Sequence, residues 1–407
     1  MYDAIVVGAR CAGAPTALLL AQKGYKVLLL DRGTFPSDMP FSNHYVHQTG
    51  SARLKRWGLL DALKATNCPP ILTNHWDYGA FSLSGEPVPA EGGVKEAFAP
   101  RRLKLDPVLV EGAVKAGAEL REGFSVQEIL FDGDRVSGIR GRHKNGSMVT
   151  EHARITIGAD GMFSKVAQAV EAPAYKSGPA LEGSWYAYYS GVPMQGWHLW
   201  LRPDRVIFAY NTNDNLSLIG VAFAAKDLAM ARSNIEQHHS ATIREHAPDL
   251  WERMEKGKRE SRYVGGAIPY HVRKPYGPGW ALVGDAGYQK DPCTASGITD
   301  AFGSAEWLAD AIDAGFTGRQ PLEQALKKYE QTRNESELPY YELTTQLAAL
   351  APPPPEIAQL LEALRYNPEQ RSRFFGVLAH TVPVTEFFSP ENMQKIFDGT
   401  KSATAIQ

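Results

Sequence analysis

The chain has few of the features that would place it in a membrane, a disulfide scaffold or a nucleic-acid complex. It has no apolar run of about 18 residues, which argues against a transmembrane helix. Its three cysteines, Cys11, Cys68 and Cys293, have no metal-ligand spacing and cannot all pair. A formal net charge of −2 gives no electrostatic reason to bind nucleic acid or an anionic membrane. We therefore expect no metal, no nucleic-acid partner and no integral membrane association.

The composition is that of an ordinary soluble protein, with 43% hydrophobic and 22% charged residues. A chain of 407 residues can form two or three domains. The first apolar run begins so close to the N-terminus that no signal peptide fits before it. We therefore expect a cytoplasmic protein, monomeric or homodimeric, with reduced thiols.

The first 32 residues have the pattern of a nucleotide-binding turn. The apolar run from Ala4 to Val7 predicts a buried parallel strand that ends at Gly8. Gly13 predicts a helix that packs closely on the sheet and turns its N-terminal amides towards a pyrophosphate. Asp31 follows the next apolar run, where an acid binds ribose hydroxyls. Arg10 stands where the G-x-G-x-x-G fingerprint has its middle glycine, so its side chain either leans away from the phosphates or contacts them.

The rest of the chain alternates between helical and strand patterns. We expect a helix over 102–123, then a β-meander with turns at Asp132-Gly133 and Asn145-Gly146, then a further strand over 155–159. Residues 181–270 are rich in strand patterns and predict an antiparallel sheet, joined by residues 75–88. The chain is helical after Gly297, with an interruption at Pro352 to Pro355.

Two later motifs complete the pattern. One is Gly158-Ala-Asp160-Gly161, and the other is Gly284-Asp285-Ala286, followed by Asp291-Pro292 and Ser296-Gly297. With the N-terminal turn they point to one dinucleotide held by distant segments. In this order the three elements resemble the class A FAD-dependent monooxygenases, in the superfamily of para-hydroxybenzoate hydroxylase and geranylgeranyl reductase, over about residues 1–335.

The resemblance implies which residues hold FAD. It places Asp285 on ribityl or ribose hydroxyls, Arg102 on the pyrophosphate, and the helix that starts near Ser296-Gly297 at the N1–C2=O edge of the flavin. The full set of cofactor-binding residues that we expect is Gly8, Arg10, Cys11, Ala12, Gly13, Asp31, Arg32, Arg102, Asp160, Gly161, Gly284, Asp285, Pro292, Ser296, Gly297 and Ile298.

Two residues depart from the family pattern. Ala295 replaces the first of the two usual glycines after the proline. Ala167 stands where an arginine often follows the Asp160-Gly161 motif, which relatives use for the pyrophosphate and for transient docking of NAD(P)H. The sequence therefore supports the binding of FAD more strongly than it supports the direct use of NADH or NADPH as reductant.

The loop after Asp31 carries the candidate catalytic residues, His44, Tyr45 and His47. Histidines near a flavin can move a proton, although they can equally serve as structural hydrogen-bonding groups in an ordered loop. The aromatic residues of 185–210 suit a flat apolar substrate or a plain core, and the sequence does not say which sheet face is inward.

The function implied is an FAD-dependent monooxygenase that hydroxylates or epoxidises an aromatic or polycyclic small molecule. It would use O2 through a flavin C4a-hydroperoxide, with NADH or NADPH as reductant. The alternative is a flavin-dependent reductase or dehydrogenase of C=C bonds, as in geranylgeranyl reductase, and a catalytically silent flavin-binding protein is a third reading. The tryptophan-rich signature of flavin halogenases, W-x-W-x-I-P, is absent, because Trp197 and Trp200 have another spacing.

The expected fold class is α/β, with a Rossmann-type FAD-binding domain that includes a β-meander, an antiparallel β-sheet substrate domain and a C-terminal helical region. We expect the FAD-binding domain to be discontinuous, over residues 1–74, 100–175 and 275–335. Residues 75–99 and 176–274 would form the substrate domain, and residues 336–407 the helical region.

Overall fold

The structure is a computed structural model that describes residues 1–39 and 41–404. Its first sheet runs in the order β19–β20–β10–β1–β2–β7, with parallel pairing from β20 to β7. The strands are β1 (Tyr2–Val7), β2 (Val27–Leu30), β7 (Glu119–Arg121), β10 (Met148–Gly158), β19 (Tyr276–Gly277) and β20 (Trp280–Leu282). Among the described residues, none of the helices combines the length and apolar character that crossing a bilayer requires.

The two faces of this sheet are covered differently. Ala4 and Val6 of β1 pack against three helices, α1 (Gly13–Gln22), α4 (Arg102–Lys115) and α9 (Gly297–Phe316). Ile5 and Val7 point the other way, into a core that they share with the meander strands β8 (Phe124–Asp132) and β9 (Arg135–His143). Because side chains alternate along a strand, an unbroken apolar run indicates cover on both faces. The interpretation of residues 4–7 as a buried strand is confirmed.

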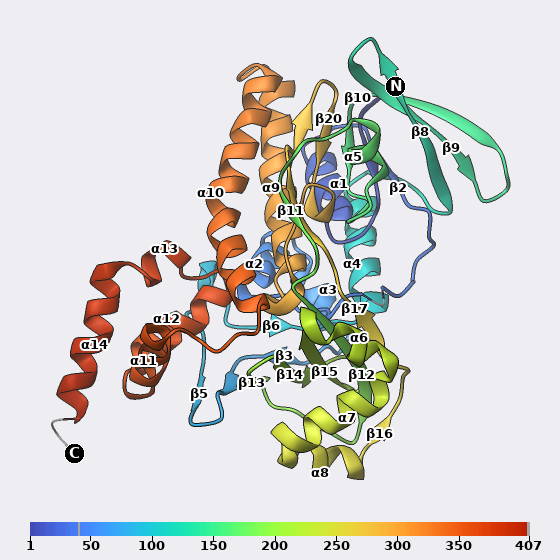
Figure 1. Ribbon diagram of the computed structural model, residues 1–407. Helices are drawn as coiled ribbons and strands as arrows, with labels where there is room; N and C mark the ends of the chain where they lie inside the picture. The colour runs from blue at the N-terminus through green and yellow to red at the C-terminus, as the bar shows by residue number, and fades with distance from the viewer. Residues whose placement is uncertain (40, 405–407) are drawn as a thin grey trace.

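Strand β10 pairs with two different strands along its length. Its first part, Met148–His152, pairs antiparallel with β9, and its last part, Ile155–Gly158, lies parallel to β1. The sequence predicted two strands here, but the chain passes from one to the other without a break. The β8–β9 hairpin consequently projects from one end of the sheet, at the upper right of Figure 1.

The predicted helix over 102–123 is too long. It ends at Lys115, because Gly117 adopts a φ of +109° that helical residues do not. Residues 119–121 then form β7, the edge strand beside β2.

The second sheet has the order β16–β12–β15–β14–β13–β4–β5, with β17 also on β12. Its pairs are antiparallel except for β13 and β4, which run parallel. The strands are β4 (Asn74–Asp77), β5 (Ser82–Gly85), β12 (Glu182–Ser190), β13 (Trp197–Arg202), β14 (Arg205–Asn211), β15 (Ser217–Ala224), β16 (Lys258–Arg259) and β17 (Val264–Gly266). The predicted participation of residues 75–88 is therefore confirmed.

Three helices interrupt the β-rich region, contrary to the expectation of strands throughout. They are α6 (Leu228–Ser233), α7 (Ile235–His246) and α8 (Pro248–Lys256). They cover the outer face of the second sheet, at the bottom of Figure 1, and bury Trp185, Tyr189 and Phe223. These aromatic residues are core residues.

The remaining elements complete the α/β fold, whose predicted class is confirmed. Long helices α9 and α10 (Leu322–Ala348) pack side by side, and the C-terminal helices lie to the left in Figure 1. The predicted boundary at residue 336 falls within α10 and stays a prediction. The smaller elements are α2 (Gln48–Arg56), α3 (Leu60–Lys64), β3 (Pro70–Ile71), β6 (Ala97–Phe98), α5 (Lys165–Ala169), β11 (Ala174–Gly178), β18 (Tyr270–Arg273), β21 (Tyr288–Gln289), α11 (Pro355–Ala363), α12 (Pro368–Leu378), α13 (Val384–Phe387) and α14 (Pro390–Thr404).

Candidate functional site

Glycines bring the three motifs together at the ends of β1, β10 and β20. A Cβ atom on Gly8 would lie 2.3 Å from the carbonyl oxygen of Ala159, and one on Gly13 would lie 1.7 Å from the carbonyl oxygen of Gly8. A Cβ atom on Gly284 would lie 2.6 Å from the Cβ of Ala12. Only glycine permits these approaches, so the later motif packs directly against the start of α1.

The start of α1 is suited to an anion. Its N-cap residue, Ala12, has no side-chain acceptor to offer, so the first-turn amides are not capped by a side chain. Asp31 accepts hydrogen bonds from the amides of Ala9 (2.9 Å) and Gly33 (2.8 Å), which fixes the turn. Arg32 is exposed, and Cys11 is buried, with a thiol pKa raised to about 12 by that burial.

Two arginines share one buried carboxylate beside this turn. Arg10 contacts Asp106 at 2.5 Å, and the Nε atom of Arg102 contacts the other oxygen of Asp106 at 2.7 Å. Arg10 also donates to the hydroxyl of Ser37 at 2.8 Å. The question left open for Arg10 has a structural answer: its guanidinium leans onto α4. Two guanidinium groups therefore lie beside the turn, and guanidinium groups suit the oxygens of a pyrophosphate.

Sequence reasoning missed Asp106, although its signal was present. It follows Arg102 by one helical turn, the spacing at which opposite charges pair on a helix. Its side chain is fully buried. An acid paired in this way orients both arginines.

The carboxylate of Asp160 is hydrogen-bonded to residues that follow it closely in the chain. It accepts hydrogen bonds from the Ser164 hydroxyl (2.5 Å) and the Lys165 amide (2.6 Å), and so caps α5. Ala167 is buried on the inner side of that helix, where an arginine would not fit. Gly161 has a φ of +78° and open space around it.

The segment before α9 ends in a turn that favours glycine. Ala295 has a φ of +54°, which explains why a glycine is usual there. The helix begins at Gly297, and no atom lies within 4 Å of a Cβ atom built on this residue. Pro292 begins the preceding turn, and Ile298 packs into the core. The hydroxyl of Ser296 donates to the Thr294 carbonyl (3.2 Å) and does not cap the helix. The start of α9 therefore faces open space with its first-turn amides uncapped by a side chain.

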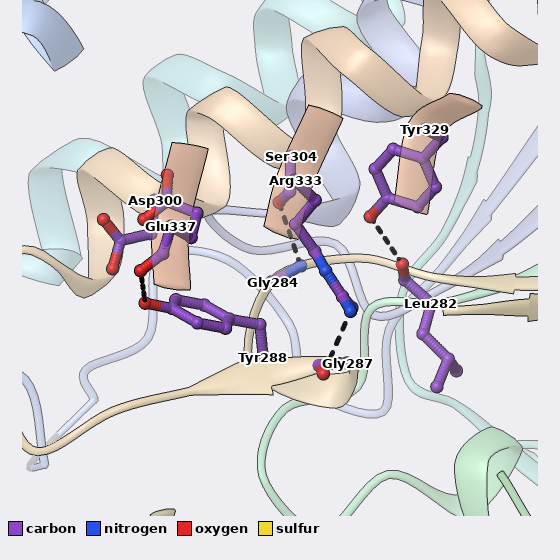
Figure 2. Close-up of a pocket in the computed structure, with 9 residues that line it drawn as sticks. All are labelled: Leu282, Gly284, Gly287, Tyr288, Asp300, Ser304, Tyr329, Arg333 and Glu337. Atoms are coloured by element: carbon purple, nitrogen blue, oxygen red, sulfur yellow. Dashed lines mark hydrogen bonds between the residues drawn. The ribbon is translucent and has the colours of Figure 1, made fainter. Parts of the chain in front are cut away.

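These features together fit FAD. The Gly284 motif lies between the two helices whose starts are uncapped: it packs against Ala12 at the start of α1, and its Gly284 amide donates to Ser304 of α9 at 3.1 Å. Burial raises the pKa of the neighbouring Asp285 to about 6, while Arg102 acts in the opposite direction. Behind this motif lies a small cavity of about 10 Å³, lined in part by Arg333, Glu337 and Tyr288 (Figure 2). It has room for about one water molecule and is too small for a substrate.

The three candidate catalytic residues occupy different surroundings. His47 is held at both ends, because its amide donates to the Thr299 hydroxyl (3.1 Å) and its Nε2 atom is 3.0 Å from the Thr294 carbonyl. Tyr45 is buried, with its ring centroid 4.7 Å from that of Trp197. These contacts favour packing and positioning for His47 and Tyr45.

His44 lies against the second sheet. Its imidazole is fully buried, its Nε2 atom is hydrogen-bonded to the hydroxyl of Tyr188, and its Nδ1 atom has no partner among the described residues. Burial, assisted by Arg102 and Arg101, holds its pKa well below the usual value, so the ring is neutral. The Arg101 guanidinium lies 5.0 Å from the centroid of the Tyr188 ring.

The inward face of the second sheet can now be assigned. It carries Tyr186, Tyr188, Tyr210, Leu218 and Trp197, which share a core with the C-terminal helices. The hydroxyl groups of Tyr186 and Tyr210 donate to the backbone carbonyls of Ser42 and Asn43, at 2.7 Å each. The loop that contains His44 is therefore anchored on this face.

Comparison with known proteins relates this chain to a reductase and to flavin-dependent enzymes. The chain is 26% identical over 350 residues to the digeranylgeranylglycerophospholipid reductase of Methanosarcina mazei, covering 80% of each. Its fold matches the flavin-dependent brominase Bmp2 (TM-score 0.81, 17% identity, all of both chains). It also matches PqsL of Pseudomonas aeruginosa, described as a probable FAD-dependent monooxygenase (TM-score 0.70, 17% identity, 92% of this chain and 99% of that one).

These solved structures are too distant in sequence to show more than the fold. A broader match comes from a family profile described as "FAD binding domain", which covers residues 1–337 and so includes all three motifs. The chain therefore belongs to the FAD binding domain family and is an FAD-dependent oxidoreductase.

Proposed function

We propose that this oxidoreductase is a monooxygenase that hydroxylates or epoxidises a flat aromatic or polycyclic substrate, with NADH or NADPH as reductant. The observation that carries the proposal is the buried His44–Tyr188 pair, in which the Nδ1 atom of a neutral ring finds no partner in the described part of the chain. A buried polar atom without a partner is costly, so it indicates a group that arrives with a ligand.

The chain's own residues would bind and orient the substrate and handle one proton. The bound flavin supplies the reaction with O2. Tyr186 and Tyr188, beside His44 on the inward face of the second sheet, would contact the ring system, and the C-terminal helices, which cover the rest of this face, would exclude water from it. The Nδ1 atom of His44 would hydrogen-bond a substrate hydroxyl or carbonyl, and Tyr188 would fix the tautomer through Nε2. Because the ring is neutral, His44 would transfer or share a proton and would not store positive charge.

A second candidate function is reduction of C=C bonds. It is favoured by the relatives at 24–26% identity that are named digeranylgeranylglycerophospholipid reductases. Both functions need the same flavin site, so the contacts to the cofactor do not distinguish them.

Isotope labelling separates the two. The FAD-loaded protein would be supplied with NADH or NADPH, ¹⁸O2 and a panel of phenolic, polycyclic and isoprenoid compounds, with product mass and O2 uptake as readouts. We expect a product that carries one ¹⁸O atom, with O2 uptake that depends on that compound. A product that gains two hydrogens without O2 uptake would establish the reductase instead.

Substitution of His44 tests its role. His44→Ala should lower kcat/KM by about 10²-fold, the usual contribution of a proton-handling side chain, with flavin content unchanged. Tyr188→Phe keeps the ring and removes the partner of Nε2, so it should cause a smaller loss. In contrast, His47→Ala should lower flavin retention, because it releases the segment before α9. Unchanged turnover in both His44→Ala and Tyr188→Phe would remove His44 from the mechanism.

A further inference from the structure

Four ionisable side chains from separate segments meet beneath the start of α9. The Nζ atom of Lys290 is 2.8 Å from one oxygen of Asp300 and 3.9 Å from Glu337 of α10. The Nε2 atom of His380, which follows α12, is 3.8 Å from the other oxygen of Asp300. The side chains are 4% exposed for Lys290, 7% for Asp300 and 5% for Glu337. Figure 2 shows Asp300 and Glu337 facing one another beside Tyr288.

The charges in this cluster balance. Burial, followed by the charge of Asp300, raises the pKa of Glu337 far above its usual value, so this residue keeps its proton at neutral pH. Burial and the nearby Lys290 hold the pKa of His380 well below its usual value, so its ring is neutral. Within the cluster one ammonium group on Lys290 and one carboxylate on Asp300 remain. Arg53, whose charge also acts on Asp300 and Glu337, is paired with Glu306 at 3.0 Å.

Asp300, Glu337 and His380 are of residue types that can ligate divalent cations, and their potential ligand atoms lie within 4.8 Å of one another. The ammonium group of Lys290 already occupies the position of the cation, however, and would repel a second one. The cluster is therefore an internal ion pair, with Lys290 as its only cation among these four residues.

Asp300 has an electrostatic effect because of where it lies. It belongs to the first turn of α9, whose amide end carries partial positive charge and faces the open space at Gly297. A lone carboxylate in this turn would cancel that positive potential. The cluster also touches the helix start directly, since His380 Nε2 is 3.3 Å from the Ser296 hydroxyl.

We propose that Lys290 is an electrostatic positioning residue for the flavin: it neutralises Asp300, so that the start of α9 keeps its positive potential and favours the reduced, anionic cofactor over the oxidised one. The proposal requires bound FAD and is independent of whether the substrate is oxygenated or reduced. It predicts a change in reduction potential, which a purely structural role for the ion pair would not produce.

The test is the two-electron midpoint potential of the bound flavin, measured by equilibration with a redox dye at about pH 7, where Glu337 keeps its proton and the charges in the cluster are those of Lys290 and Asp300. Lys290→Met should lower the ratio of affinities for reduced and oxidised FAD about tenfold, which is a shift of about −30 mV for a two-electron couple. Asp300→Asn should shift the potential in the positive direction. Lys290→Arg, which keeps the charge, should stay close to the unsubstituted protein.

The double variant Lys290→Met/Asp300→Asn makes the test decisive. It contains neither charge, so its potential should return close to that of the unsubstituted protein, even if its melting temperature is lower. Thermal melting and the dissociation constant of oxidised FAD would be measured on every variant to detect misfolding. An unshifted potential in Lys290→Met, or a shift of equal size in Lys290→Arg or in the double variant, would overturn the proposal.

Discussion

Four glycines of the cofactor site act in two different ways. Gly8, Gly13 and Gly284 allow backbone segments to touch, because a Cβ atom on any of them would overlap another part of the chain. Gly297 differs, since a Cβ atom there would meet nothing within 4 Å, and its φ is not in the left-handed region. The protein alone therefore gives no reason for glycine at position 297, whereas a cofactor that occupies the open space would.

Gly297→Ala separates cofactor binding from folding. We expect an apo-protein at least as stable as the original, because alanine favours a helix over glycine by up to about 1 kcal/mol. The affinity for FAD should fall at least tenfold, since the added methyl group would enter the space in front of the helix. Urea unfolding of the apo-protein and FAD titration would measure the two effects. Gly13→Ala is the matched control and should lose both stability and FAD, and an unchanged FAD affinity in Gly297→Ala would contradict the assignment.

At this scale the sequence predicted the glycines and acids of the nucleotide turn, because their signals are local. It did not separate His44 from His47. Their partners, Tyr188 and the carbonyl of Thr294, lie 144 and 247 residues further along the chain. The roles of neighbouring loop residues are set by such distant contacts, and no local pattern encodes them.

At the scale of elements, a pair of buried acids joins β12 to the segment before α9. Glu182, at the start of β12, lies close enough to Asp291 for the two carboxyl groups to interact. Both oxygens of Glu182 and one of Asp291 have no donor among the described residues. Burial raises the pKa of both groups, to about 6 for Asp291 and well above the usual value for Glu182. Two adjacent carboxyl groups in this environment share a proton.

This pair predicts a stability that declines as the pH rises. In the unfolded chain both groups have a pKa of about 4, and in the folded protein the pKa values are higher. Their contribution is therefore complete below about pH 4 and is lost as the pH rises through about 6 and beyond. Glu182→Gln keeps a donor for Asp291 and removes one titrating group, so its melting temperature should fall less between pH 5 and pH 8.

Thermal melting of both proteins across this range is the measurement. Glu128→Gln is the control, because Glu128 is an exposed carboxylate of β8 whose ion pair with Arg140 contributes little. Parallel melting curves for Glu182→Gln and the unsubstituted protein would show that the acids do not share a proton.

What the sequence left open at this scale also has a physical explanation. Every residue of β15 is buried, because helices cover one sheet face and the C-terminal region covers the other. Such a strand shows no alternation, so its inward face could not be told from its pattern. Strand β7 is three residues long and is defined only by its pairing with β2, which no local signal reveals.

At the scale of the whole molecule, the C-terminal helices and the second sheet form one core. The ring of Phe375 in α12 lies 4.9 Å from that of Trp76 in β4, and Phe374 lies 5.5 Å from the same tryptophan. The sequence indicated helices here but did not show what their apolar residues contact. The apolar pairs are used within the chain, where they cover the inward face of the sheet.

Phe375→Ala should therefore destabilise the sheet together with the C-terminal region. A fully buried phenylalanine reduced to alanine costs about 3–5 kcal/mol of unfolding free energy. Phe163→Ala is the control, because Phe163 is 72% exposed and its loss should have an effect close to zero. Urea unfolding followed by tryptophan fluorescence would report on both. A loss below about 1 kcal/mol in Phe375→Ala would mean that the C-terminal helices are only loosely attached.

The meeting of Gly8, Ala159 and Gly284 has a consequence for the way in which the protein matures in the cell. During synthesis the turn at Gly8 emerges early, but the helix start at Gly297 follows only after nearly three hundred further residues have been translated. Complete flavin capture must therefore wait until α9 has left the ribosome, and the β1–α1 unit spends that interval with an incomplete binding site. The supply of FAD should consequently limit the yield of native protein at the stage when α9 joins the sheet, because the site is completed and FAD binds at that same stage.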